Sequence, residues 1–135
     1  MTPIRLTGPR VTLRSTTPDD AAILPPIRNE PEVLRWWGRL ESGEMDEFVA
    51  DEHSLAIEVD GVVVGAAQYG EEEDPMYRNA NIDVYLTASR HGEGLGSEAV
   101  FVLARYLIEE RGHHRLTIDP AAENAAAIRA YEKVG

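Results

Sequence analysis

Residues Arg90 to Val100, "RHGEGLGSEAV", carry glycine at every second position from Gly92 to Gly96, and a run with helical periodicity follows directly. Glycine inside a regular element costs roughly 0.5–1 kcal/mol relative to alanine, so this cluster at the start of a helix needs a physical reason. The usual reason is that something must approach the main chain closely. Because free N–H groups at a helix start attract anions, the pattern predicts an anion-binding turn, with a merely tight strand-to-helix turn as the alternative.

Two common glycine fingerprints do not fit this stretch. A P-loop requires Gly-Lys-Ser/Thr, and the turn contains no lysine. A dinucleotide-binding fingerprint is matched only in its looser form, with Ala99 in the last position, and no first β-α unit followed by an acidic residue lies in the right place. The predicted anion site is therefore of another kind.

The composition is that of one soluble globular domain over residues 1–135. Of the 135 residues, 43% are hydrophobic and 27% are charged. No apolar stretch reaches the roughly 18 residues of a membrane span, and the signal-peptide pattern is absent, so we expect a cytoplasmic protein with no membrane partner. The chain has no cysteine, which excludes disulfides, thiolate zinc sites and cysteine nucleophiles.

The net charge of the chain restricts the classes of partner that it can bind. The net charge is −11 at pH 7, whereas nucleic-acid binders carry a basic face, so we expect no nucleic-acid partner. An acidic protein is compatible with a cationic partner, and a solvated acidic surface is the alternative. The four histidines lack metal-ligand spacing, and we expect no metal.

Hydropathy patterns predict elements along the chain. Alternation favours a strand over 11–14, and Thr17 as N-cap before Pro18 is typical of a helix start, here for a helix over 18–29. Asp60-Gly61 between two apolar runs is a strong hairpin signal. Before the glycine turn, the other expected elements are short helices from 31 to 37 and over 45–52, strands on both sides of the hairpin turn, an acidic loop over 71–75 and a strand over 80–87. After it, we expect a helix from the glycine turn to Gly112, a strand over 114–119 and a last helix over 123–134. The helix that follows the glycine turn has an apolar stripe from Val100 to Ile108. A strand-helix-strand crossover of this length implies that the strands before and after the glycine helix are parallel.

Two segments together resemble a known family. "HGEGLGSEA" (91–99), followed by "ENAAAIRAYEKVG" (123–135), is similar to motifs A and B of the GCN5-related N-acetyltransferase (GNAT) superfamily. The resemblance implies a mixed α/β (α+β) fold, with a mostly antiparallel sheet, a central pair of splayed parallel strands and flanking helices. It also implies an enzyme that uses acetyl-CoA.

The resemblance implies a set of acetyl-CoA contacts. Main-chain N–H groups of the turn would hold the diphosphate, the preceding strand would pair with the pantetheine, and Asn124 would bond the CoA arm. His91 stands where the family usually has Arg or Gln, for which Arg90 compensates, and Glu93 places a negative charge where a basic residue is common. The implied cofactor-binding residues are Val84, Tyr85, Leu86, Arg90, His91, Gly92, Glu93, Gly94, Leu95, Gly96, Ser97 and Asn124.

Two residues are candidates for proton transfer. Tyr131 matches the tyrosine that family members place beside the CoA sulfur as general acid, and a core tyrosine is the alternative. Asp83 lies mid-strand among apolar neighbours, where aspartate is disfavoured. It either pairs with another group or titrates with a raised pKa, and both suit a general base; a solvent-facing Asp83 is the alternative. Without cysteine, we expect direct transfer of the acetyl group to an amine.

Within the superfamily, the chain is most similar to bacterial aminoglycoside 6'-N-acetyltransferases. The similarity lies in "EVLRWWG", "EEEDP", "IDVYL", "GEGLGSEAV" and "IDPAAENAAAIRAYEKVG". It implies that Asp83 and Asp119 meet substrate ammonium groups and that Trp36 and Trp37 line the acceptor wall, with antibiotic resistance as the implied context. Carboxylates and aromatic faces suit a compact polyamine. The alternatives are that one tryptophan belongs to the core and that "EEEDP" is a solvated loop.

Other functions remain open. A GNAT enzyme could instead acetylate a protein N-terminus, a lysine-like metabolite or a siderophore precursor, and a non-catalytic acetyl-CoA-binding domain would share the same turn. GNAT domains normally continue beyond a segment like "YEKVG" into two more strands, whereas this sequence stops at Gly135. Because an open sheet edge favours association, we expect either a homodimer that completes the sheet or a C-terminally incomplete domain.

Overall fold

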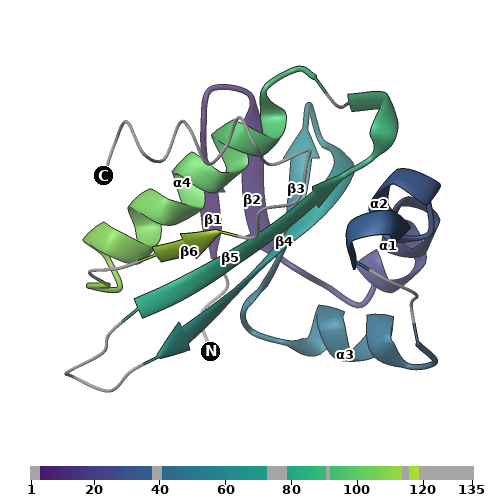
Figure 1. Cartoon of the computed structure of the whole chain (residues 1–135), viewed down its shortest axis with the longest axis horizontal. Coiled ribbons are helices and arrows are strands. Elements are labelled where there is room, and N and C mark those ends of the chain that lie inside the picture. Colours follow the sequence, from purple (N-terminus) through teal and green to yellow (C-terminus); the bar gives the residue numbers. More distant parts are fainter. Residues whose placement is uncertain (1–3, 38–40, 73–78, 91, 114–115, 119–135) are drawn as a thin grey trace.

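The computed structural model describes residues 4–37, 41–72, 79–90, 92–113 and 116–118. Its strands are β1 (Arg5–Thr7), β2 (Val11–Ser15), β3 (Ser54–Val59), β4 (Val62–Glu72), β5 (Asn79–Leu86) and β6 (Leu116–Ile118). Its helices are α1 (Asp20–Arg28), α2 (Pro31–Trp37), α3 (Glu44–Ala50), the short 3-10 helix η1 (Ala88–Arg90) and α4 (Leu95–Glu109). In this part of the chain the strands form one sheet in the order β1 to β6 (Figure 1).

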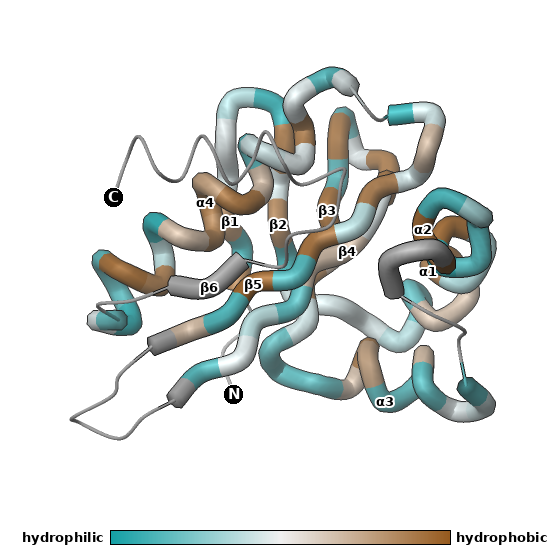
Figure 2. Tube along the Cα trace, viewed as in Figure 1, coloured by the Kyte–Doolittle hydropathy of each residue, from teal (hydrophilic) through white to brown (hydrophobic). Residues whose placement is uncertain are grey.

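The sheet separates two apolar layers. Along β5, Val84 and Leu86 pack on the same side as Leu103 of α4, whereas Tyr85 packs on the other side with Leu24 of α1. This division follows from the alternation of side chains along a strand. Figure 1 shows α4 on one side of the sheet and α1, α2 and α3 on the other, and Figure 2 shows hydrophobic residues along β3, β5 and α4. The fold is therefore a mixed α/β arrangement, as predicted.

Both predicted strand pairings are confirmed. The hairpin between β3 and β4 turns at Asp60 and Gly61, which have positive φ angles of 53° and 79°, as a two-residue type I′ turn requires. β5 is antiparallel to β4 and parallel to β6, with Ala80 opposite Leu116. Since α4 links β5 to β6, this is the crossover that the sequence pattern implied.

The N-terminal region differs from the prediction in two respects. β1 was not expected, because a strand of three residues is too short to show a hydropathy period. The first helix begins at Asp20 rather than Pro18, and Thr17 does not cap it. The Asp20 carboxylate instead accepts a hydrogen bond from the Thr17 N–H at 2.8 Å and pairs with Arg14, while the Asp20 N–H bonds to the Thr17 carbonyl.

The remaining expectations meet different outcomes. The helices expected near Pro31 and Met45 are present as α2 and α3. The acidic loop predicted over 71–75 is wrong at its first two residues, because β4 continues through Glu72, and residues 73–75 lie outside the described residues. Ile108 does not complete the apolar stripe of α4: its side chain is 39% exposed, while Leu107 is fully buried. The last predicted helix, residues 123–134, lies outside the described residues.

Candidate functional site

The turn between β5 and α4 leaves main-chain groups open. Gly92 and Gly94 have φ angles of 82° and 80°, a conformation that side-chain-bearing residues rarely adopt. Apart from its chain neighbours, no described atom lies within 4 Å of a Cβ built on Gly92. The N–H of Glu98 donates to the Gly94 carbonyl at 3.1 Å. The main-chain N–H groups that precede it in the first turn have no acceptor within the helix itself. Open space beside such donors suits an anion.

Two carboxylates from distant positions anchor this turn. Glu30, just after α1, accepts hydrogen bonds from the Thr87 hydroxyl at 2.6 Å and from the Ala88 N–H at 2.7 Å, where the chain leaves β5. Glu98, in the first turns of α4, accepts a hydrogen bond from the main-chain N–H of Arg10 at 2.6 Å. Sequence reasoning missed these carboxylates, because their partners lie 57 to 88 residues away along the chain.

The charge of Glu93 is partly balanced within the turn. Arg90 Nε lies 3.2 Å from Glu93 Oε2, and both side chains are partly exposed. A pair of this kind is worth little in stability because water screens it, but it lowers the local negative charge. Arg90 thus lies where it can offset Glu93, while His91 lies outside the described residues.

Asp83 is half-buried on the face of β5 that α1, α2 and α3 cover. Its neighbour across the strand pair is Gln68 of β4. Gln68 and Tyr85 line a cavity of about 210 Å³, whose other lining residues are Arg28, Glu44, Met45, Glu47, Phe48 and Asp51. Three of these are carboxylates and one is an arginine, which lies 3.5 Å from Glu44. Asp83 is not itself a lining residue, but Gln68 opposite it and Tyr85 two residues along the strand are, so this small acidic cavity lies beside Asp83. Its carboxylates suit a cationic amine.

Tyr85 closes this cavity toward the sheet. Burial raises the pKa of the Tyr85 phenol above its usual range, although nearby Arg28 acts in the opposite direction. The phenol is therefore neutral at physiological pH. Because Tyr85 is 1% exposed, its main contribution on this face is a buried aromatic wall.

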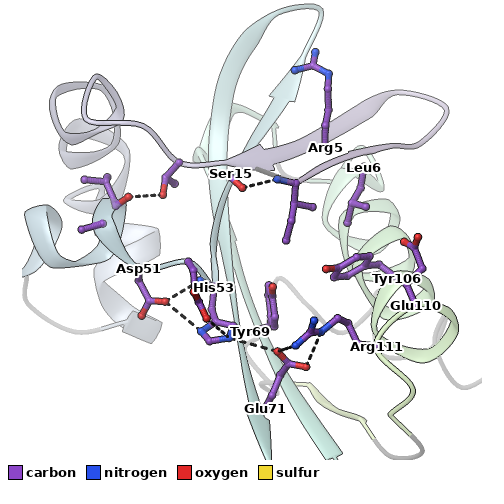
Figure 3. A pocket seen from close by; sticks show the side chains of 15 residues that line it. Arg5, Leu6, Ser15, Asp51, His53, Tyr69, Glu71, Tyr106, Glu110 and Arg111 are labelled. Atoms are coloured by element: carbon purple, nitrogen blue, oxygen red, sulfur yellow. Dashed lines mark hydrogen bonds and ion pairs between the residues drawn. The ribbon is translucent and has the colours of Figure 1, made fainter. Parts of the chain in front are cut away.

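A larger cavity lies elsewhere, at the C-terminal end of α4 (Figure 3). It has a volume of about 700 Å³, and its polar floor is Glu71, whose side chain is 5% exposed. Glu71 lies 3.2 Å from Arg111, 2.5 Å from His113 and 3.4 Å from His53. Burial acts to raise the pKa of Glu71, but hydrogen bonds from Arg111 and His113 outweigh it and hold that pKa below its ordinary value. The floor of this cavity is thus already satisfied by the chain.

Several predicted site residues cannot be placed. Asp119, Asn124 and Tyr131 lie outside the described residues. Trp36 and Trp37 are the last two residues of α2, and only their main chain is described. The described part of the site therefore consists of the glycine turn, the Asp83 region of β5 and the small acidic cavity.

No group of three or more His, Cys, Asp or Glu side chains within the described ranges is arranged to hold a metal ion. No helix of that part of the chain has both the length and the apolar character needed to cross a bilayer.

Comparison with known proteins bears directly on this arrangement. The family model of the acetyltransferase (GNAT) domain matches residues 10–135. The aminoglycoside N(6')-acetyltransferase type 1 of Klebsiella pneumoniae is 31% identical over 147 aligned positions, which cover 93% of this chain and 73% of that protein. A solved structure of AAC(6')-Ib with an aminoglycoside and acetyl-CoA is 32% identical with a TM-score of 0.72, covering 93% of this chain and 82% of that one. A GNAT-family acetyltransferase from Bacillus anthracis, at 18% identity, shares the fold with a TM-score of 0.79, covering 98% of this chain and 82% of its own.

Proposed function

We propose that this chain, which belongs to the GNAT acetyltransferase family and is an acetyl-CoA-dependent N-acetyltransferase, acetylates a primary amine of an aminoglycoside-like polycation. The observation that carries the proposal is the small cavity beside Asp83, where Glu44, Glu47 and Asp51 outnumber Arg28. A compact polycation can pair with several carboxylates at once. The relatives at 31% and 32% identity, whose names specify aminoglycosides, support the same class.

On the donor side, the open turn supports a diphosphate site. We infer that main-chain N–H groups from Gly92 to Ser97 hold the diphosphate of acetyl-CoA, because a helix start with no obstructing side chains is a natural anion site. The main chain of Val84 to Leu86 would pair with the pantetheine, and Asn124 would bond the CoA arm. Arg90 would add positive charge beside the phosphates, although Glu93 partly offsets it.

The chemical step needs a neutral amine and a proton for the departing sulfur. Acetyl-CoA supplies the acetyl group as a thioester. Asp83 accepts a proton from the substrate ammonium, directly or through one water. The amine nitrogen then bonds to the acetyl carbon as the carbon–sulfur bond breaks, and a main-chain N–H of the same strand polarises the carbonyl. Tyr131 donates its phenolic proton to the CoA sulfur, and the proton that leaves the amide nitrogen returns to the Tyr131 phenolate, directly or through water.

An acceptor screen tests this proposal. The release of CoA thiol is measured with kanamycin, with a peptide bearing a free N-terminus, and with lysine and other small amines. We expect the highest kcat/KM with kanamycin, since its several ammonium groups match the acidic cavity. A preference for the peptide or for lysine would contradict the proposed acceptor and favour another GNAT function. CoA binding without turnover of any amine would favour a non-catalytic acetyl-CoA-binding domain.

Substitution of Asp83 tests the assigned base. We expect Asp83→Asn to lower kcat about 100-fold near pH 7 while leaving the KM for acetyl-CoA nearly unchanged, because a general base contributes to the chemical step. Asp46→Asn, on the exposed side of α3, is the matched control and should leave kcat unchanged. Tyr131→Phe tests the acid in the same assay. If Asp83→Asn instead raised the KM for acetyl-CoA and left kcat unchanged, Asp83 would not be the general base.

Three wider statements stay predictions. They are the role in antibiotic resistance, the cytoplasmic location and the homodimer. The acceptor screen bears on the first, and solution mass at several concentrations bears on the last.

A further inference from the structure

Arg10 reaches the glycine turn from a distant part of the chain. It lies in the turn between β1 and β2, and its Nη1 donates a hydrogen bond to the main-chain carbonyl of Glu93 at 2.7 Å. Its Nε donates to Glu98 Oε1 at 2.8 Å. A Cβ built on Gly94 would lie 3.3 Å from Arg10 Nη2, so the guanidinium lies directly against the turn. Arg10 therefore bridges the turn and the first part of α4.

Glu98 holds Arg10 in this position. One oxygen of its carboxylate accepts the main-chain N–H groups of Arg10 and Val11 at 2.6 and 2.7 Å, and the other accepts the Arg10 side chain. Burial acts to raise the pKa of Glu98, but these hydrogen bonds outweigh it and hold that pKa below its ordinary value, so the carboxylate is ionised. A Cβ at Gly8 would lie 2.8 Å from a methyl carbon of Val102, which shows how closely this hairpin packs on α4. The guanidinium is therefore fixed from both ends.

Holding the Glu93 carbonyl has a consequence for the next N–H. A trans peptide is planar, and its C=O and N–H groups point in opposite directions. When Arg10 draws the Glu93 carbonyl toward the hairpin, the N–H of Gly94 is directed away from it. Glycine on both sides of Glu93 would otherwise allow this peptide to rotate, because glycine populates positive and negative φ with similar ease. Arg10 selects one of these orientations before any ligand arrives.

We propose that Arg10 is a positioning residue for the acetyl-CoA site: by binding the carbonyl of Glu93 it fixes the Gly94 N–H as a donor to the diphosphate. This inference rests on the proposed function of the glycine turn. It also explains how a turn that carries Glu93 and Glu98 can accept an anion, since Arg90 pairs with Glu93 and Arg10 pairs with Glu98. Without the hydrogen bond from Arg10, the conformational entropy lost in ordering the turn would weaken the binding of acetyl-CoA.

The test compares two acetyl donors that differ in the phosphates. Acetyl-CoA carries the diphosphate, whereas S-acetylpantetheine lacks it. We expect Arg10→Ala to raise the KM for acetyl-CoA and the calorimetric Kd for CoA about tenfold, with kcat within about twofold and no change in the KM for S-acetylpantetheine. Arg5→Ala is the matched control, because it removes the same charge from the adjacent strand, where Arg5 is exposed. It should leave all these values unchanged.

Arg10→Lys separates position from charge. Lysine keeps the charge but has no planar fork to bond the Glu93 carbonyl and the Glu98 carboxylate together. We expect the CoA affinity of Arg10→Lys to stay several-fold below that of the wild type. Full recovery with lysine, an unchanged Kd in Arg10→Ala, or equal losses with both donors would each overturn the positioning role. Melting temperature and circular dichroism show whether each variant is folded. Failure of the wild-type protein to bind CoA would instead overturn the proposed function itself.

Discussion

At its N-terminal end, α4 meets a turn in which Gly92 and Gly94 have positive φ angles and, among the described residues, Gly92 borders open space. At its C-terminal end, Glu71 is enclosed by Arg111, His113 and His53. The ends are about 22 Å apart, since the helix has 15 residues at about 1.5 Å each. Each end contains a buried carboxylate with a lowered pKa, Glu98 in one case and Glu71 in the other. The difference is that Glu98 holds a turn in which Gly92 borders open space, whereas the Glu71 carboxylate is satisfied by Arg111 and His113 within the fold.

This difference separates stabilising polar groups from binding groups. Buried polar groups in folded proteins nearly always find partners, and the Glu71 carboxylate does so within the chain. The cavity above it is larger than the acidic cavity beside Asp83, at about 700 against 210 Å³, yet its deepest charge is already neutralised. Size alone therefore does not identify the site. Main-chain N–H donors that the fold leaves available are a better guide to the binding site.

Removing Glu71 should have the largest effect on stability. Glu71→Ala leaves His113, whose side chain is 1% exposed, without its carboxylate partner. We expect the free energy of unfolding to fall by about 3 kcal/mol in urea denaturation, with the calorimetric Kd for CoA unchanged. Glu109→Ala is the control at the same end of α4, and loss of its exposed pair with Arg105 should cost less than about 0.5 kcal/mol. Weaker CoA binding by Glu71→Ala at normal stability would mean that the two ends form one functional unit.

Replacing a glycine of the turn should have a smaller effect on stability and a specific effect on binding. Gly94→Ala places a side chain at a φ of 80°, which costs about 1–2 kcal/mol, and we expect CoA affinity to fall about tenfold. Gly43→Ala is a close control, because Gly43 also precedes a helix with a φ of 80° and has no described atom within 4 Å of an added Cβ. It should lose similar stability and keep CoA affinity. Equal losses of affinity in both variants would contradict a diphosphate site at the turn.

The smallest expected effect is on how the free energy of unfolding falls at acidic pH. The pKa values of Glu71 and Glu98 are both held below the ordinary value in the folded protein. Their stabilisation is therefore complete above the unfolded pKa of about 4.3 and is lost as the pH falls through the folded pKa. Glu71→Gln and Glu98→Gln should each flatten the decline in unfolding free energy below about pH 4.3. A variant that declined as steeply as the wild type would show that its carboxylate does not contribute.

Local patterns were sufficient for much of the fold. Asp60-Gly61 specified the hairpin because both turn residues must adopt positive φ, a property of the dipeptide itself. The glycine turn and the amphipathic run after it specified the start of α4 and the parallel crossover in the same way. The N-cap pattern at Thr17 was misleading, because the Asp20 N–H bonds to the Thr17 carbonyl rather than to its hydroxyl, and the helix begins only at Asp20.

The sequence by itself determined the elements whose signal lies within a few residues, together with the family resemblance that Gly92, Gly94 and Gly96 carry within motif A. Only the tertiary structure decided which charged residues meet. Arg10 contacts Glu93 across 83 residues of chain, and His113 contacts Glu71 across 42. Hydropathy and propensity describe one residue and its near neighbours, whereas an ion pair depends on the sheet order that brings distant strands together. For that reason the open turn could be predicted, and the residues that hold it could not.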